Sequence, residues 1–241
     1  MYQRDLAYIH DTGFTGFVSK AAPGLLRILR RHRIREGLVV DAGCGSGVWA
    51  RSLTDSGYDV LGIDISASMI GLARKQAPAA KFKIESFFRA VLPPCDAVTS
   101  IGECLNYGFD PSCGKASLTR FFRRVYEALR PGGIFIFDVV EPGILHGETP
   151  QRRFLEGPDW AILLEVREDP KHGVLTRQIT SFRRVGRLYR RSQELHRLHL
   201  FTRAELQELL SQTGFELGVL GGYGRLRFAP EHVGFLARRL S

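Results

Sequence analysis

The sequence has few cysteines, no long apolar run and no repeated segment, and each absence narrows the class of protein. No stretch approaches the roughly 18 uncharged apolar residues that cross a bilayer as a helix. The opening residues, MYQRDLAYIHDTGF, contain no apolar core, so we expect no secretory signal. The four cysteines form no Cys-x-x-Cys pair and no zinc-type spacing with histidine, so we expect reduced thiols, a cytoplasmic location and no bound metal.

The composition provides enough apolar residues for a sizeable core. The chain also carries a positive charge that is unevenly distributed. The 241 residues are 44% hydrophobic, which suits one large domain with an elaboration. The net charge is +9, and eight of the arginines fall between Arg177 and Arg203. These arginines alternate with apolar residues, which favours the solvated face of a strand. An anion-binding or nucleic-acid-binding face is the alternative.

The order of apolar and polar residues predicts helices first and then a parallel sheet. Residues 1–36 have helical periodicity, with Ser19 as the expected N-cap and Pro23 in the first turn of the second helix. Residues 37–140 then alternate short apolar strands with amphipathic helices, one of which has Ser66 as its expected N-cap. Such alternation indicates a parallel sheet that helices cover on both faces.

The pattern changes in residues 150–200, which alternate apolar and polar residues like strands. We expect two or three antiparallel strands here, inserted into the α/β domain. A last helix follows, with a capping box of Thr202 and Glu205, and two closing strands make a terminal hairpin. The predicted fold class is therefore α/β, a doubly wound seven-stranded sheet, mostly parallel with a C-terminal antiparallel hairpin, plus a small antiparallel β insertion. The expected parts are a helical lid at 1–36, the main domain at 37–149 and 201–241, and the insertion at 150–200 as a cover for an acceptor.

A glycine-rich turn, VVDAGCGSG, follows the first strand, where open parallel sheets bind ligands. Gly43, Gly45 and Gly47 allow a tight turn and a close approach of the backbone to a ligand. A phosphate-binding P-loop requires a lysine that is missing after Gly47, which disfavours nucleoside triphosphates.

A dinucleotide is the stronger competitor for this turn. The residues from Gly45 to Ala50 fit G-x-G-x-x-A, and Asp64 ends the second strand where a ribose-binding acid belongs. Asp41 argues against it, because a carboxylate in the same turn would repel a pyrophosphate. An acid here favours a ligand that carries positive charge. An NAD(P)-dependent oxidoreductase stays the alternative, although Asp64 would repel the 2′-phosphate of NADP.

Four segments, VVDAGCGSG, LGIDIS, CDAVTSIGECLNY and RPGGIFIFDVV, together resemble the class I S-adenosylmethionine-dependent methyltransferases. The resemblance covers residues 35–140 well, and residues 201–240 in their layout. It implies a Rossmann-like sheet, S-adenosylmethionine as cofactor, and transfer of its methyl group to a nitrogen or oxygen of a small molecule.

The resemblance also implies where the cofactor lies. The residues at its methionine end are Asp41, Gly43, Gly45 and Gly47. The residues at its ribose and adenine are Asp64, Ile65, Met69, Ser86 and Phe87; this chain has Glu85-Ser86 where the family usually has Gly-Asp. The residues beside its sulfonium are Ile101, Gly102 and Glu103.

The acceptor is less clearly marked. Family members that methylate exocyclic base amines commonly carry an Asn/Asp-Pro-Pro-aromatic tetrapeptide after the fourth strand, where this chain reads IGECLNY. Nucleic acid is therefore disfavoured, and the resemblance implies a small-molecule acceptor, as in the sugar N-methyltransferases. We expect no membrane partner, and a homodimer is an option. A basic nucleic-acid-binding protein with a regulatory cofactor site is the third hypothesis.

Candidate catalytic residues lie in the insertion and after the fourth strand. Glu194 and His196 point to one face of a strand, so His196 is a candidate base that Glu194 orients; a cross-strand ion pair with an arginine is the alternative. Glu103 is a third candidate. Tyr107, on the same loop, is a candidate for lining the acceptor pocket. For Asp138, capping of a turn and contact with the substrate both stay open. Residues that belong either to a lid or to simple helix packing are Tyr8, His10 and Phe14.

Overall fold

A computed structural model describes residues 1–111, 113–145 and 149–240, and its largest element is a seven-stranded sheet of order β10-β13-β5-β4-β1-β2-β3. All pairings among β1 to β5 are parallel, while β13 is antiparallel to both β5 and β10. The predicted sheet with its terminal hairpin is confirmed. The strands are β1 (Leu38–Ala42), β2 (Asp59–Asp64), β3 (Lys81–Ile84), β4 (Cys95–Ser100), β5 (Leu129–Val140), β10 (Glu216–Leu220) and β13 (His232–Arg238).

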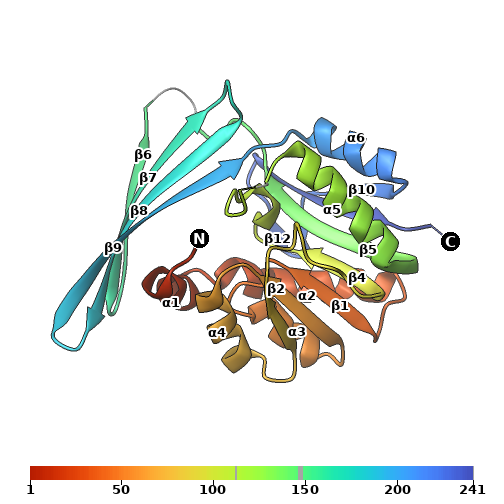
Figure 1. Cartoon of the computed structure of the whole chain (residues 1–241), viewed down its shortest axis with the longest axis horizontal. Helices are drawn as coiled ribbons and strands as arrows, with labels where there is room; N and C mark the ends of the chain where they lie inside the picture. The colour runs from red at the N-terminus through yellow and green to blue at the C-terminus, as the bar shows by residue number, and fades with distance from the viewer. Residues whose placement is uncertain (112, 146–148, 241) are drawn as a thin grey trace.

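Helices cover both faces of this sheet because its central strands are apolar on both sides (Figure 1). Neighbouring residues of β1 show the division: Val39 packs into a cluster with Leu25 and Trp49, and Val40 into a second cluster with Phe121 and Phe137. The helices on the first side are α2 (Gly16–Arg31), α3 (Val48–Thr54) and α4 (Ala67–Gln76). Those on the second side are α5 (Lys115–Ala128) and α6 (Arg203–Thr213).

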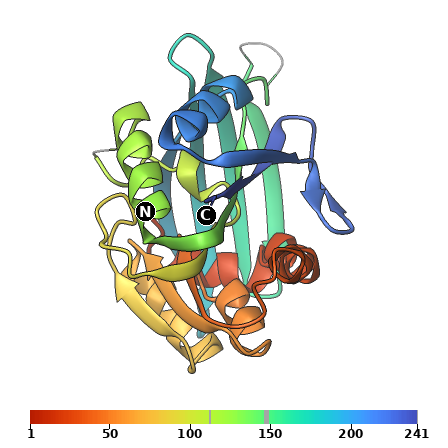
Figure 2. The same cartoon turned by 90° about the vertical axis from the view of Figure 1, so that its right-hand side faces the viewer.

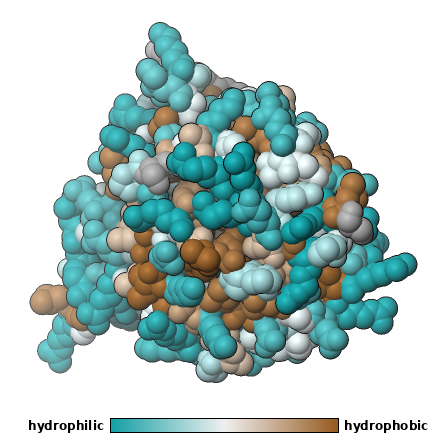
Figure 3. Space-filling model, turned by 45° about the vertical axis from the view of Figure 1, so that its right-hand side comes forward, coloured by the Kyte–Doolittle hydropathy of each residue, from teal (hydrophilic) through white to brown (hydrophobic). Residues whose placement is uncertain are grey.

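Figure 3 shows one face of the molecule coloured by hydropathy. In Figure 3, hydrophilic side chains surround an apolar area at the centre of the face. Within the described part of the chain, every helix is too short or too polar to cross a membrane.

The insertion is a separate four-stranded antiparallel sheet of order β6-β7-β8-β9. It stands to one side of the main sheet, with α1 (Arg4–Gly13) between them in Figure 1, and its strands run behind the main sheet in Figure 2. Its strands are β6 (Gln151–Gly157), β7 (Trp160–Asp169), β8 (Val174–Val185) and β9 (Leu188–His199). The sequence predicted two or three strands; β6 was missed because this edge strand is largely exposed and carries no apolar alternation.

Two of the three predicted helix starts are confirmed. The Ser66 hydroxyl accepts a hydrogen bond from Met69 N, and Thr202 and Glu205 form the capping box. The prediction that Ser19 caps α2 is wrong, because Ser19 N already donates to Thr15 O and Pro23 lies inside the helix. Tertiary packing extends this helix upstream: one of its early residues, Phe17, stacks on the rings of Phe228 and His232. A small hairpin of β11 (Gly222–Tyr223) and β12 (Leu226–Arg227) was not predicted.

One buried side chain ties the main sheet to the insertion. Asn106 lies in the short helix η1 (Cys104–Asn106) after β4 and is fully buried. Its Nδ2 donates to Val140 O at 3.0 Å and to His199 O at 2.7 Å, and its Oδ1 accepts from Val140 N at 3.0 Å. The ends of β5 and β9 are therefore held to the loop that follows β4.

Replacing Asn106 by alanine should destabilise the whole chain. Asn106→Ala leaves three buried backbone groups without their partners, and each such loss costs about 1–3 kcal/mol. We expect the free energy of unfolding in urea to fall by about 3 kcal/mol or more. Gln193→Ala, on the exposed face of β9, is the control and should change it by less than about 0.5 kcal/mol. A change below about 1 kcal/mol in Asn106→Ala would contradict the assigned role.

Candidate active site

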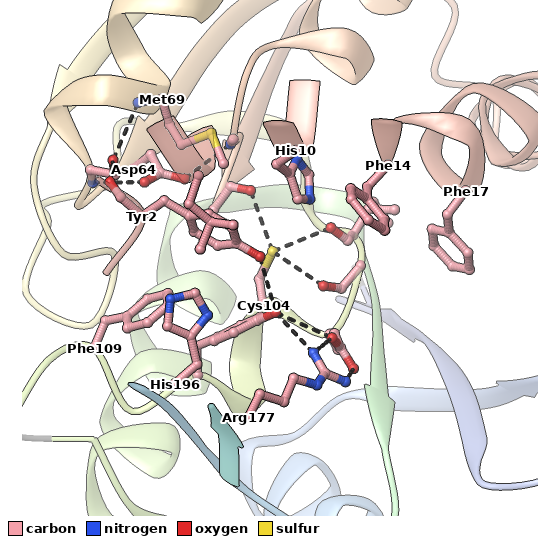
Figure 4. A pocket seen from close by; sticks show the side chains of 18 of the residues that line it. Tyr2, His10, Phe14, Phe17, Asp64, Met69, Cys104, Phe109, Arg177 and His196 are labelled. Carbon is pink, nitrogen blue, oxygen red and sulfur yellow. Dashed lines mark hydrogen bonds and ion pairs between the residues drawn. The ribbon is translucent and has the colours of Figure 1, made fainter. Parts of the chain in front are cut away.

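A cavity of about 500 Å³ lies between the carboxyl ends of the parallel strands and the inner face of the insertion, and α1 closes it (Figure 4). It brings together twelve of the predicted site residues. Those that line it are Asp41, Gly43, Gly45, Asp64, Ile65, Met69, Ser86, Phe87, Ile101, Gly102, Glu103 and His196. Gly47 and Glu194 lie just outside its wall.

The glycine-rich turn has a left-handed backbone at each predicted position. The φ angles of Gly43, Gly45 and Gly47 are 82°, 52° and 85°, which side-chain-bearing residues rarely adopt. A Cβ on Gly43 would lie 2.7 Å from Cys104 Sγ, and one on Gly47 would lie 2.9 Å from Ala73 Cα. A Cβ on Gly45 would meet no atom within 4 Å. Packing therefore requires the outer two glycines, while the middle one leaves room for a ligand.

Asp41 is a buried carboxyl group with one hydrogen-bond donor beside it. It is 2% exposed, and its Oδ1 accepts from Thr99 Oγ1 at 3.0 Å. Trp49 Nε1 donates to that hydroxyl in turn, at 3.1 Å, which fixes its direction. Burial raises the pKa of Asp41 to about 7, opposed by the Thr99 hydrogen bond and aided by the charge of Asp64. A cationic ligand placed here would restore the charged form.

Asp64 holds the glycine-rich turn to the start of α4. Its Oδ2 accepts from Gly45 N at 3.0 Å, and its Oδ1 accepts from Ser66 N at 2.8 Å. Burial raises the pKa of Asp64, and these two amide hydrogen bonds oppose the shift. Each carboxylate oxygen has a further lone pair and can accept a hydrogen bond from a ligand.

Asp138 holds the loop after β4 through hydrogen bonds from the backbone of that loop. It is fully buried and accepts from the backbone N of Gly102 at 3.0 Å and of Glu103 at 2.9 Å. Tyr223 Oη donates to it at 2.8 Å, and His232 Nε2 lies 2.7 Å away. Two roles were left open for Asp138, capping of a turn and contact with the substrate. Its hydrogen bonds to the loop after β4 and its place outside the cavity lining agree with capping of a turn.

Glu103 is held by an arginine from the insertion. Arg177 forms an ion pair with both carboxylate oxygens of Glu103, and its Nη1 also donates to Tyr107 Oη at 3.0 Å. Arg177 and Arg183 are thus partly buried and paired, which differs from the solvated face favoured for this run of arginines. The remaining members of the run are exposed: Arg184, Arg187, Arg190, Arg191, Arg197 and Arg203.

His196 and Glu194 do share one face of β9 and contact each other. His196 Nε2 lies 2.9 Å from Glu194 Oε2, and Gln3 N donates to Glu194 Oε1 at 3.0 Å. His196 is fully buried, and burial lowers its pKa. Its catalytic role stays a prediction. The rings that pack edge-on against it, with centroids within 6 Å, are Tyr2, Tyr107 and Phe109.

Of the three residues predicted for a lid, two line the cavity. His10 and Phe14 do so, whereas Tyr8 faces the insertion. Tyr8 Oη donates to Asp159 at 2.8 Å, and the Arg183 guanidinium lies 3.6 Å from the centre of its ring. The N-terminal segment is thus attached to the insertion and closes the cavity.

Tyr2 is a cavity residue that the sequence did not reveal. Its Oη lies 3.3 Å from Tyr107 Oη, and its carbonyl accepts from Ser66 Oγ at 2.7 Å. A single tyrosine near the start of the chain carries no periodicity or motif that would have identified it. The insertion adds an aliphatic wall that was likewise not predicted residue by residue: Leu155, Ile162, Leu164, Val166, Leu175 and Ile179.

Comparisons with known proteins agree with this geometry. Residues 14–218 match the family described as "Methyltransferase domain". The chain is 23% identical over 240 residues to dTDP-3-amino-3,6-dideoxy-alpha-D-glucopyranose N,N-dimethyltransferase of Streptomyces fradiae, covering 92% of this chain and 88% of that one. Curated relatives at 33% identity are matched over only 41–50% of their own length.

Solved structures show the same fold at low sequence identity. A S-adenosylmethionine-dependent methyltransferase from Clostridium acetobutylicum ATCC 824 superposes with a TM-score of 0.83 at 17% identity, over 98% of both chains. CalS10, an amino pentose methyltransferase from Micromonospora echinaspora with S-adenosylmethionine bound, has a TM-score of 0.76 at 19% identity, over 99% of this chain and 98% of that one. The predicted Rossmann-like fold class is confirmed.

Proposed function

The chain belongs to the class I S-adenosylmethionine-dependent methyltransferases, and on this premise we propose that it methylates a nitrogen or oxygen of a small, largely apolar acceptor. The observation that carries the proposal is one cavity with two unlike sides. Buried carboxyl groups lie at the ends of β1 and β2, and the aliphatic face of the insertion lies opposite. When bound, S-adenosylmethionine supplies an electrophilic methyl group on a sulfonium.

The residues present fit that cofactor. Asp41 suits its ammonium group, because a cation restores the charge that burial disfavours on this carboxyl. Asp64 retains the lone pairs that ribose hydroxyls need, and the open space at Gly45 admits the methionine end. The residues proposed for the adenine and sulfonium are those of the sequence prediction: Ile65, Met69, Ser86, Phe87, Ile101, Gly102 and Glu103.

The acceptor side is proposed from its chemistry. Methyl transfer is an in-line displacement, so the protein contributes mainly alignment and exclusion of water. The aliphatic side chains of β6, β7 and β8 favour an apolar body over a phosphate. Two arginines also line the cavity: Arg177 is already neutralised by Glu103, and Arg153 donates to Gln151 Oε1 at 3.3 Å. In this proposal residues 150–200 cover the acceptor, and residues 1–36 form the lid.

The alternatives receive less support. The charge of Asp41 disfavours the pyrophosphate of NAD(P). Nucleic acid is disfavoured because Arg183 and Arg190, two arginines of the insertion, both pair with Asp5. The relative from Streptomyces fradiae has a name that specifies an amino sugar, which favours nitrogen as the acceptor atom. The cytoplasmic location agrees with four free cysteines, and a homodimer stays a prediction.

Removing the Asp64 carboxylate should weaken cofactor binding. A charge-assisted hydrogen bond to a ribose hydroxyl is worth about 1.5–3 kcal/mol, so Asp64→Ala should raise the Kd for S-adenosylmethionine about 10- to 100-fold. Isothermal calorimetry measures it, with S-adenosylhomocysteine and NADPH titrated in parallel. Asp59→Ala, exposed at the other end of β2, is the matched control. Unchanged affinity in Asp64→Ala, or binding of NADPH alone, would count against the proposal.

Cofactor affinity should fall in acid because of Asp41. Its raised pKa, about 7, means that the carboxyl becomes neutral as pH falls below 7 and must lose a proton to pair with the ammonium group. The affinity should therefore decrease by up to about tenfold per pH unit below pH 7. Calorimetry from pH 5.5 to 8 checks this, and Asp41→Asn should flatten the curve. A slope that persists unchanged in Asp41→Asn would assign the effect to another group.

The acceptor class can be screened through formation of S-adenosylhomocysteine. Amines and phenols with apolar rings form one set of probes, and single-stranded RNA together with nucleotide sugars forms the other. We expect turnover with the first set to exceed that with the second at least tenfold, because the wall that the insertion contributes is mainly aliphatic and Arg177 is paired with Glu103. Preferential methylation of RNA would replace the small-molecule proposal.

A further inference from the structure

Three histidines line the cavity, His10, His196 and His232, and they differ in what their rings contact. His232 is held by Asp138, whose Oδ2 lies 2.7 Å from its Nε2, and its ring stacks on Phe17 and Phe228.

His196 offers a ligand no ring nitrogen: its Nε2 contacts Glu194, its Nδ1 is buried, and its ring is fully enclosed. The Glu194 carboxylate also accepts from Gln3 N. The pair therefore holds the start of the chain on the insertion.

His10 lies near the end of α1, and unlike His196 it keeps a ring nitrogen that a ligand can reach. It is only partly buried, and neither of its ring nitrogens has a hydrogen-bond partner among the described residues. Its Nδ1 is shielded, so Nε2 is the nitrogen left for a ligand. Figure 4 shows the His10 ring directed into the cavity from α1, near Tyr2 and above Cys104.

The surroundings of His10 keep it neutral. Burial lowers its pKa below the ordinary value of 6.5, and the charge of His196 acts in the same direction, while Asp11 and Glu103 oppose it. Further titratable groups lining the cavity include Tyr2, whose ring lies edge-on to His10 at 5.1 Å, and Arg177, which Glu103 neutralises. Cys104, Tyr107 and His232 line it as well. A neutral imidazole can accept a proton at pH 7.

We propose that His10, in place of His196, is the catalytic base, and that its Nε2 contacts the acceptor and takes its proton. This inference rests on the proposed function. The acceptor lone pair forms the new bond to the methyl carbon, and the carbon–sulfur bond breaks with its electron pair going to sulfur. The acceptor proton passes to His10 Nε2. Glu194 and His196 are then positioning residues, which hold residues 1–3 over the cavity.

The first test needs no acceptor. Diethyl pyrocarbonate acylates accessible neutral imidazole nitrogens, and peptide mass spectrometry of the full-length protein gives the rate at each histidine. His10 should react at least tenfold faster than His196, with exposed His172 as the reference for full reactivity. Equal rates at His10 and His196, or a faster reaction at His196, would overturn the proposal.

The second test uses the acceptor found by the screen and compares His10→Gln with His196→Gln. His10→Gln should lower kcat about 100-fold at pH 7, the lower end of the usual range for a general base, and should remove the acid limb of the kcat profile. His196→Gln should raise KM and keep that limb, and His172→Gln is the control with unchanged turnover. Loss of the acid limb in His196→Gln, with the limb kept in His10→Gln, would overturn the proposal.

Calorimetry separates this proposal from the one on which it rests. His10→Gln should bind S-adenosylmethionine with the wild-type Kd, because the His10 ring has no hydrogen-bond partner among the residues that the structure describes. Absence of cofactor binding in the wild type would overturn both proposals. Normal binding with an unchanged kcat in His10→Gln would overturn the assignment of the base alone.

Discussion

Buried carboxyl groups at the carboxyl ends of parallel strands organise this molecule, and they differ in how many of their hydrogen bonds the protein itself supplies. Asp138 near the end of β5 has four partners: two amides, a tyrosine and a histidine. Asp64 at the end of β2 has two amides, and Asp41 in β1 has one hydroxyl. The cost of burying a carboxylate falls as its partners increase, so the first is structural and the last is best completed by a ligand.

The hydrogen bonds of these carboxyl groups also explain how the cavity is built. Asp138 fixes the loop that carries Gly102 and Glu103, and Asp64 fixes the glycine-rich turn to α4. Both effects act through backbone amides, so the wall on the cofactor side is rigid without filling the space in front of it. Asn106 then connects this wall to the ends of β5 and β9, which sets the distance between the two sheets.

The acceptor side depends on contacts between distant parts of the chain. Residues 1–13 contact the insertion through Gln3 and Glu194, through Asp5 with two arginines, and through Tyr8 with Asp159. These polar contacts surround a buried apolar cluster, in which Leu6 and Ile9 of α1 pack on Trp160, Ile162 and Ile179 of the insertion. The first helix is therefore held on the insertion by apolar packing as well as by polar contacts.

The sequence by itself determined the features that depend on local chemistry: the glycine turn, the capping box at Thr202, the N-cap at Ser66 and the strand–helix alternation that defines the main sheet. Each of these arises within a few residues, where backbone conformation and short-range hydrogen bonds decide the outcome. The acids at the strand ends followed from the same alternation, because parallel strands end at one edge.

Only the tertiary structure decided the rest. The pair of Glu103 with Arg177 joins residues 74 positions apart, and β6 owes its place to pairing with β7 rather than to any pattern of its own. The start of α2 moved upstream because of a ring stack that local propensity does not encode. Whether His10 or His196 keeps an accessible nitrogen depends on what packs around each ring. Sequence spacing does not determine how side chains from distant segments pack.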